Sequence, residues 1–287
     1  MKTAIVLGGK TGLLGQALAL ALENRGWLVH ALGREDVDIF DLTAIKHFLS
    51  TTRADVLFNT VAYTKVDQAE DEPAEASLLN RQLPLILGKA VAETKALLVH
   101  YSTDFVFNGK KDTPYTTEDL PEPGSVYGQT KLQGEQELLN LHLPNLLILR
   151  TSWLFGPGRT NFVTRILELA AQRSELSVVH DQVGSPSYTL DLADNTLALM
   201  DHGATGLFHL ANSGQASWCE LAAEAVRCAG LTCQIKPITS AEYPQQAQRP
   251  YYSVLDLNAF SRITNIIPRP WPQALREFLF ARFKAQI

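Results

Sequence analysis

The first half of the chain alternates short apolar runs with longer amphipathic segments. The apolar runs have the length and continuity expected of buried strands, and they cover residues 2–9, 27–33, 54–62, 96–103 and 145–155. Between them, helical patterns cover residues 13–24, 42–51, about 75–93 and 125–141. Buried strands that alternate with helices indicate a parallel sheet covered on both faces. We therefore predict an α/β fold with a doubly wound, Rossmann-like parallel sheet.

The alternation of apolar runs and helical patterns becomes less regular after residue 156, where shorter elements and proline-rich stretches follow. Further helices are expected near residues 160–173, 190–200 and 217–229. We expect a dinucleotide-binding domain and a smaller C-terminal substrate-binding lobe that is interleaved with its end. The domain comprises residues 1–155 plus about 188–211, and the lobe comprises residues 156–187 plus 212–287.

Composition narrows the class of protein. The 287 residues carry a net charge of −5, and no basic cluster is longer than Lys110–Lys111, which argues against nucleic acid or a membrane surface as partner. No apolar run reaches the length of a membrane span, and the N-terminus reads as a strand and not as a signal peptide. The three cysteines, Cys219, Cys228 and Cys233, lack metal-binding spacing. We therefore expect a reduced, cytoplasmic protein.

Glycines follow the first strand in the spacing Gly9-x-x-Gly12-x-x-Gly15. Glycine allows a tight turn and a close approach of the backbone to a pyrophosphate at a helix N-terminus. Glycines in such a turn can also be purely structural. Their place between the first strand and the first helix favours a dinucleotide site, which also includes Lys10.

The end of the second strand bears on the choice of cofactor. An NAD site usually has an acidic residue there, but this chain has Gly33 and Arg34. An arginine can pair with a 2′-phosphate, so NADP(H) is favoured over NAD(H), although a solvated loop arginine is the alternative. We place Asp38 near the adenine with Ile39 beside it, while Asp41 suits a helix N-cap equally well.

Candidate catalytic residues follow the fourth strand. Ser102, Thr103 and Asp104 stand at its carboxyl end, where parallel sheets bind ligands. Tyr127 and Lys131 lie four residues apart, so they share one face of the next helix. An ammonium group nearby is expected to lower the tyrosine pKa and to make the phenol a proton donor, while Lys131 also holds the nicotinamide ribose. A capping hydroxyl and a packed tyrosine are the alternative, which the combination of three residues in this order disfavours.

The chain resembles the extended short-chain dehydrogenase/reductases and, within them, the dTDP-4-dehydrorhamnose reductase family. The resemblance covers nearly the whole length and is carried by "GGKTGLLG", "NTVAYTKVDQAE", "YSTDFVFNG", "YGQTKLQGE", "RTSWLFG", "DQVGSPS" and "RPYYSVLD". It implies NADPH- or NADH-dependent reduction of the 4-keto group of dTDP-4-dehydro-β-L-rhamnose to dTDP-L-rhamnose.

The resemblance also implies roles for single residues. Thr103, Tyr127 and Lys131 match the family's catalytic set, and the cofactor residues match Gly9, Thr11, Gly12, Leu13, Leu14, Gly15, Ala62 and Tyr63. The implied substrate residues are Thr64, Val66, Asp104, Trp153 and, for the diphosphate, Arg249. Trp153 can instead be a core residue, and Arg249 can instead form a surface ion pair.

Some positions depart from the family pattern. Thr60 and Val61 replace small alanines near the cofactor, and Ser187 ends the motif "DQVGSPS". Where some family members bind Mg²⁺ at a dimer interface through glutamates, this chain has Ala17 and Leu190. We predict no metal, because carboxylate ligands are missing, and leave a monomer and a homodimer open.

Two alternatives compete with the reductase: another sugar-nucleotide enzyme of the same fold, either a dehydratase or an epimerase, and a catalytically idle subunit. A sugar-nucleotide dehydratase needs a second carboxyl group after the catalytic threonine, but Phe105 follows Asp104. An epimerase usually retains NAD, which Arg34 disfavours. A catalytically idle regulatory subunit would keep the glycine turn and lose the catalytic residues, all three of which are present here.

Overall fold

A six-stranded parallel sheet organises the protein, which is represented by a computed structural model that describes residues 1–284. The strands are β1 (Thr3–Leu7), β2 (Leu28–Leu32), β3 (Val56–Asn59), β4 (Leu97–Thr103), β5 (Leu146–Thr151) and β10 (Gly206–His209). Their order is β10-β5-β4-β3-β1-β2, and every neighbouring pair is parallel. The order reverses between β1 and β3, which is where doubly wound sheets bind ligands. The predicted fold class is confirmed.

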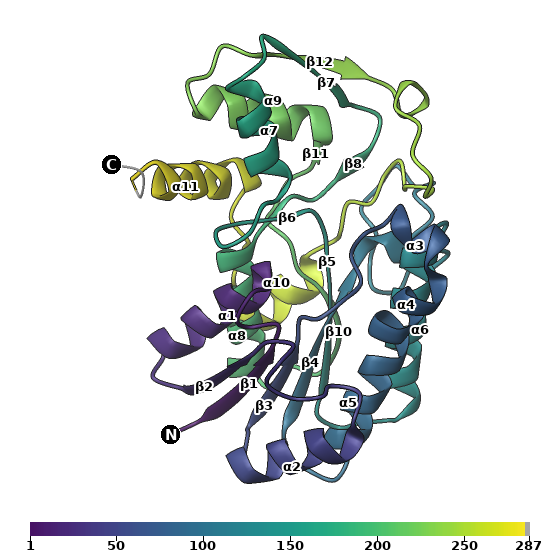
Figure 1. Ribbon diagram of the computed structural model, residues 1–287, viewed down its shortest axis with the longest axis vertical. Helices are drawn as coiled ribbons and strands as arrows, with labels where there is room; N and C mark the ends of the chain where they lie inside the picture. Colours follow the sequence, from purple (N-terminus) through teal and green to yellow (C-terminus); the bar gives the residue numbers. More distant parts are fainter. Residues whose placement is uncertain (285–287) are drawn as a thin grey trace.

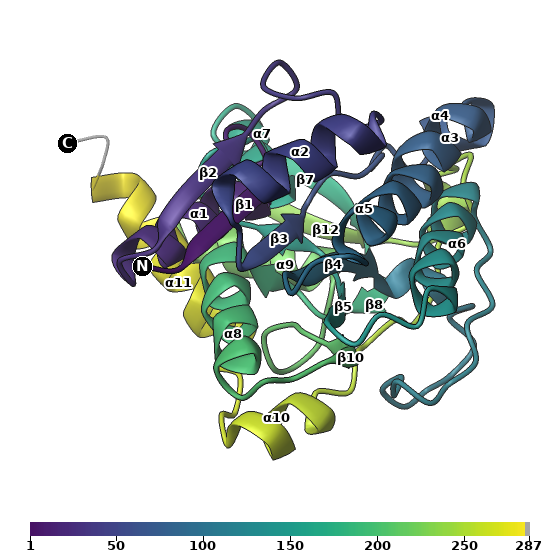
Figure 2. The same cartoon turned by 90° about the horizontal axis from the view of Figure 1, so that it is seen from below.

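Helices cover both faces of the sheet (Figures 1 and 2). Ala4 and Val6 of β1 belong to the apolar cluster under α1 (Leu13–Asn24), α8 (Thr189–Asp201) and α10 (Asn258–Thr264). Ile5 and Leu7 belong to the cluster on the other face, under α2 (Leu42–Thr52), α5 (Leu83–Val91) and α6 (Val126–Asn140). Successive residues of β1 therefore serve opposite faces, which explains its continuous apolar sequence.

The helix predicted over residues 75–93 is interrupted. After the short α3 (Gln68–Asp71), the chain forms α4 (Pro73–Ser77), a π-helical turn at Leu78–Gln82 and then α5. Pro84 has no N–H, so the carbonyl of Asn80 loses its usual α-helical donor. The same carbonyl lies where a side chain at Gly134 would collide with it, at 2.1 Å from the Cβ position. The turn thus lets α6 pack closely.

The smaller lobe lies above the carboxyl ends of the sheet strands (Figure 1). Its helices are α7 (Phe162–Ala170), α9 (Trp218–Cys228) and α11 (Trp271–Lys284). Its short strands are β6 (Leu154–Phe155), β7 (Glu175–Val179), β8 (Val183–Gly184), β9 (Ser187–Tyr188), β11 (Ala216–Ser217) and β12 (Gln234–Ile238). Phe155, Tyr188 and Phe278 pack in its core. Among residues 1–284, no helix has the length and hydropathy that crossing a bilayer requires.

Candidate active site

The glycine turn after β1 is closely packed. A Cβ at Gly12 or Gly15 would lie 2.7 or 2.4 Å from the Gly8 carbonyl oxygen, so neither position has room for a side chain. Thr60 closes the turn from β3, because its hydroxyl donates to the Leu7 carbonyl at 2.6 Å. Gly12 is the N-cap of α1 and offers no capping side chain. The first turn of α1 therefore presents backbone N–H groups at the reversal point of the sheet.

The predicted 2′-phosphate region lies at the end of β2. Lys10 forms an ion pair of 2.5 Å with Asp36, whose other oxygen accepts from the Gly33 N–H at 2.6 Å. These hydrogen bonds, with that from Lys10 the larger effect, lower the pKa of Asp36. Arg34 is exposed beside this closed loop. The carboxylate of Asp36 is therefore paired with Lys10 and with the Gly33 backbone and does not bind Arg34.

The neighbouring acidic residues, Asp38 and Asp41, accept hydrogen bonds from backbone N–H groups. Asp38 accepts from the Phe40 N–H at 3.0 Å, and its exposed carboxylate closes a turn. Asp41 caps α2 by accepting from the N–H groups of Thr43 and Ala44, which confirms the N-cap alternative. Ile39 packs half-buried against the cluster under α2. The adenine role of Asp38 stays a prediction.

The segment after β3 contains four of the predicted cofactor and substrate residues, Ala62, Tyr63, Thr64 and Val66. The Tyr63 N–H donates to Asn80 Oδ1 at 2.9 Å, and its hydroxyl donates to Glu72 at 2.5 Å. Burial, followed by the bond to Glu72, raises the pKa of Tyr63 to about 12. Ala62 precedes it, half-buried, and the remaining two residues are the exposed Thr64 and the half-buried Val66.

Thr103 and Tyr127 meet at the centre of the site. Thr103 ends β4 and caps the short 3₁₀ turn Asp104–Val106 by accepting from the Phe105 N–H at 3.2 Å. Ser125 caps α6 through the Gly128 N–H, and this places Tyr127 in the first turn of that helix. Gly128 lies so close to the turn that a Cβ there would be 2.3 Å from the Phe105 carbonyl. This contact holds the tyrosine beside β4.

The prediction that the pKa of Tyr127 is lowered by a nearby ammonium group is wrong. Burial raises the pKa of this phenol to about 12, the hydrogen bond with Thr103 lowers it in part, and the charge of Asp104 adds to the increase. Lys131 is not among the causes, because its ammonium group points elsewhere: Nζ donates to the Tyr101 carbonyl at 2.6 Å. In this structure Tyr127 is therefore a protonated phenol, a state suited to giving up a proton.

Lys131 is almost completely buried. It is 2 % exposed, and burial lowers its pKa to about 8, against the opposing effect of Glu135. Its Nζ lies 3.5 Å from His100 Nε2, and His100 Nδ1 lies 3.0 Å from Asn59 Nδ2. Neither His100 nor Asn59 is among the site residues predicted from the sequence. Their signal was a polar residue within an otherwise apolar strand.

Asp104 links the sheet domain to the lobe. It is buried, and its two oxygens accept from the hydroxyls of Ser253, at 2.6 Å, and Thr103, at 3.1 Å. Burial raises the pKa of Asp104 to about 7, although both hydroxyls lower it. Ser102 is also buried, and among residues 1–284 its hydroxyl has no hydrogen-bond partner. Both side chains thus offer polar groups at the end of β4.

The raised pKa of Asp104 predicts a pH dependence of stability. Because the folded state holds this proton up to about pH 7 and the unfolded state only to about pH 4, the contribution of Asp104 to the free energy of unfolding falls as pH rises between these values. The lowered pKa values of the buried His100 and His209 contribute in the opposite direction, so the variant is compared with the wild type at each pH. The free energy of unfolding of Asp104→Asn relative to wild type should rise from pH 5 to pH 7, measured by urea unfolding at pH 5, 6 and 7. For Asp119→Asn the same difference should stay constant, since the ion pair with Lys111 lowers the pKa of Asp119. Equal slopes in wild type and Asp104→Asn contradict the prediction.

Trp153 occupies a left-handed backbone conformation between β5 and β6, with φ of +51°. This bend splits the strand predicted over residues 145–155, and such a conformation is uncommon for a bulky residue. The indole stacks on Trp218 with 3.5 Å between ring centroids and 5° between planes. A Cβ at Gly184 would lie 2.6 Å from the Trp153 ring. One aromatic face of Trp153 is therefore already covered by the lobe.

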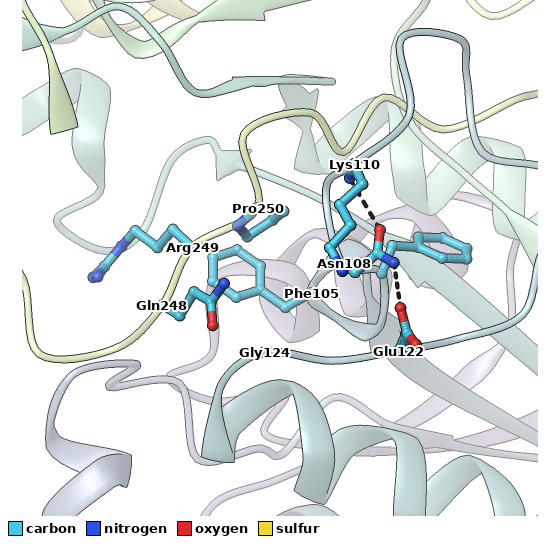
Figure 3. Close-up of a pocket in the computed structure, with 9 residues that line it drawn as sticks. Phe105, Asn108, Lys110, Glu122, Gly124, Gln248, Arg249 and Pro250 are labelled. Carbon is cyan, nitrogen blue, oxygen red and sulfur yellow. Dashed lines mark hydrogen bonds between the residues drawn. The ribbon is translucent and has the colours of Figure 1, made fainter.

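Arg249 forms the ion pair that the sequence left as an alternative. Its two terminal nitrogens donate to both oxygens of Asp67, at 2.9 and 2.6 Å. This bond lowers the pKa of Asp67. The backbone of Arg249 belongs to a segment that borders a small pocket (Figure 3).

That pocket lies next to the candidate site, which it reaches at Phe105. It is lined by Phe105, Phe107, Asn108, Lys110, Glu122, Gly124, Gln248, Arg249 and Pro250. Phe105 connects it to the site, because its ring meets that of Tyr127 edge to face at 5.5 Å. In Figure 3, Gln248 and Pro250 lie close to Phe105, whereas the guanidinium group of Arg249 points away. The pocket therefore borders a residue that packs directly against Tyr127.

Two residues, Ala17 and Leu190, stand where some family members have Mg²⁺-binding glutamates, and their surroundings are apolar. Ala17 of α1 and Leu190 of α8 both pack in or against the cluster on that face of the sheet. Across residues 1–284, no group of three His, Cys, Asp or Glu side chains is arranged to hold a metal ion.

Comparison with known proteins gives the family. The model of the RmlD substrate binding domain matches residues 1–283. The spore coat polysaccharide biosynthesis protein SpsK of Bacillus subtilis (strain 168) is 39% identical over 99% of each chain, and a dTDP-4-dehydrorhamnose reductase of Streptomyces griseus is 38% identical over 94% of this chain and 90% of that one. The crystal structure of the Bacillus anthracis dTDP-4-dehydrorhamnose reductase in complex with NADP superposes with a TM-score of 0.93, at 32% identity over 98% and 100% of the two chains. The chain belongs to the dTDP-4-dehydrorhamnose reductase family.

Proposed function

We propose that this protein reduces the 4-keto group of dTDP-4-dehydro-β-L-rhamnose to give dTDP-L-rhamnose, with NADPH as the preferred cofactor. The observation that carries the proposal is the pairing of Thr103 with Tyr127 beside a buried Lys131, at the carboxyl end of β4. Membership of the reductase family supports the same reaction. The pocket next to Phe105 supports binding of the sugar nucleotide at this end of the sheet.

The chain fits a dinucleotide at the glycine turn. Any side chain at Gly12 or Gly15 would collide with the turn itself, so the backbone alone forms this surface. A pyrophosphate there would meet the uncapped first turn of α1. Ser102, whose buried hydroxyl has no partner within residues 1–284, lies near the carboxyl end of β4 at the same edge of the sheet. When bound, the cofactor supplies a hydride to the keto carbon.

The protein's own residues handle the oxygen and the proton. The Tyr127 phenol donates its proton to the 4-oxygen as that atom gains negative charge, and the Thr103 hydroxyl turns its one hydrogen from Asp104 to the same oxygen. Lys131, as the ammonium form, has N–H donors beyond the one on the Tyr101 carbonyl, and with these it would hold the nicotinamide ribose. Asp104, which Ser253 holds in place, positions the threonine before the substrate binds. These roles require Tyr127 to be protonated at the start, which agrees with its raised pKa.

Binding of the diphosphate is assigned to Arg249. A planar guanidinium suits two phosphate oxygens, and both terminal nitrogens of Arg249 now bind Asp67. Arg249 must therefore exchange the carboxylate for the diphosphate when it uses the same nitrogens.

Arg34→Ala tests the preference for NADPH. Arg34 is exposed, and the charge of Asp36 beside it is paired with Lys10, so Arg34 suits a 2′-phosphate. The variant should therefore raise the Michaelis constant for NADPH by about tenfold and that for NADH much less. Both constants are measured from initial rates of cofactor oxidation at fixed sugar concentration. Equal increases for the two cofactors contradict the 2′-phosphate role.

The reaction itself is tested by cofactor oxidation with enzymatically prepared dTDP-4-dehydro-β-L-rhamnose. Rapid loss of NADPH absorbance, and formation of dTDP-L-rhamnose, are the expected results. Tight NADPH binding without turnover points to another 4-keto sugar nucleotide or to the idle regulatory subunit. A cytoplasmic location is supported by three cysteines that are all free thiols.

A further inference from the structure

A row of buried polar side chains lies behind Lys131 and plays no part in the proposed reaction. It runs from Lys131 Nζ to His100 Nε2, at 3.5 Å, and from His100 Nδ1 to the side-chain nitrogen of Asn59, at 3.0 Å. All three side chains are at most 2 % exposed. β3 and β4 pair Asn59 directly with His100, so the sheet itself fixes the contact. A buried imidazole in this position needs a suitable partner for each ring nitrogen.

The orientation of Asn59 decides which nitrogen of His100 carries the proton. Asn59 Oδ1 accepts from the backbone N–H of Val61 at 3.2 Å, so its NH₂ group faces the imidazole. An amide NH₂ only donates, and Nδ1 of His100 must therefore accept. Burial, and then the charge of Lys131, hold the pKa of His100 well below its usual range, so the ring is neutral. Its single proton then sits on Nε2, the nitrogen that faces Lys131.

This tautomer has a consequence for Lys131. A protonated Nε2 cannot accept from an ammonium group, but it can donate to the lone pair of a neutral amine. The same amine still donates to the Tyr101 carbonyl. The other titratable groups near Lys131 on α6 are Tyr127 and Glu135, and the charge of Glu135 is paired with Arg150. The imidazole thus opposes the ammonium form from the side of the sheet.

We propose that His100, oriented by Asn59, is a positioning residue that favours the neutral form of Lys131 and thereby sets the pH above which activity is lost. The inference rests on the proposed function, in which the ammonium form of Lys131 is the active one. Activity should then decline as pH rises through the pKa of Lys131, which burial lowers to about 8. An acceptor in place of the imidazole N–H would favour the ammonium form and move this decline to higher pH.

The tautomer can be measured first and needs no substrate. In protein labelled with ¹⁵N-histidine, the His100 ring is assigned by its absence from the spectrum of His100→Gln. At pH 7 we expect a protonated Nε2 and an unprotonated Nδ1. A ring protonated on Nδ1, or on both nitrogens, overturns the proposal.

His100→Gln then tests the effect on Lys131. A glutamine amide is free to turn its oxygen toward the ammonium group, so the alkaline midpoint of the pH profile of kcat/KM should rise by about one unit. The matched control is His209→Gln, since His209 is also a buried strand histidine, but its Nδ1 contacts the Tyr115 carbonyl. An unchanged midpoint in His100→Gln, or an equal shift in the control, overturns the proposal.

A second readout separates this inference from the reaction. The Lys131 Cε resonance in ¹³C-lysine protein, assigned with Lys131→Met, reports the protonation of the amine directly. Its titration should move to higher pH in His100→Gln, and identical titrations in wild type and variant overturn the role of His100. Lack of turnover with a shifted titration would refute the reductase and leave the role of His100 standing.

Discussion

Tyr127→Phe should lower kcat by about 10²–10⁴-fold, the usual contribution of a positioned acid–base group. The phenol is hydrogen-bonded to Thr103 at the end of β4, where the proposed reaction places the 4-oxygen. Phenylalanine keeps the ring and its edge-to-face contact with Phe105. NADPH affinity should stay close to that of the wild type, since the glycine turn is untouched. The measurements are the rate of NADPH oxidation and a fluorescence titration with NADPH.

Tyr188→Phe is the matched control for this loss. Tyr188 is a buried tyrosine in the core of the smaller lobe, where its ring stacks on Phe155. Removing its hydroxyl makes the same chemical change away from β4, and kcat should stay near that of the wild type. Near-normal turnover in Tyr127→Phe, or an equal loss in both variants, would remove Tyr127 from the proton-donating role.

The sheet domain was largely predictable because its signals are local. A helix predicted over residues 13–24 is observed as Leu13–Asn24, and the five apolar runs of the first half contain β1 to β5. In each case the apolar period and the bounding glycines or polar residues agree with the fold. The elements that were missed include β12, α10 and α11. Prolines concealed α11 because Pro272 reads as a loop, whereas a proline is well tolerated in the first turn of a helix.

The residues of the site were predictable only where their spacing within one strand or helix indicates that they lie together. Tyr127 and Lys131 share a helix, so their spacing indicated a common face. The direction of the Lys131 ammonium group depends on the Tyr101 carbonyl and His100 of a strand 30 residues earlier, and no local pattern encodes that. The pairing of Arg249 with Asp67 joins positions 182 apart for the same reason. Burial, which raises the pKa of Tyr127, is likewise a property of the assembled fold.

Glu135→Gln should cost about 3–5 kcal/mol of the free energy of unfolding, the usual cost of breaking a buried ion pair. Glu135 on α6 binds Arg150 on β5 through both oxygens, at 2.7 to 3.3 Å, with both side chains at most 3 % exposed. The guanidinium also lies 5.1 Å from the centre of the Phe107 ring. A glutamine would leave this buried cation without a counter-charge. Urea unfolding at pH 7 measures the loss.

Glu137→Gln, two residues further along the same helix, provides the comparison. Glu137 accepts from two nitrogens of Arg81, and the two side chains are 24 % and 48 % exposed. Because water screens this pair, its loss should cost only about 0–1 kcal/mol. Both variants remove one carboxylate from α6, so the difference between them isolates burial. If the two losses are equal, the Glu135–Arg150 pair does not hold α6 to the sheet in the way its geometry indicates.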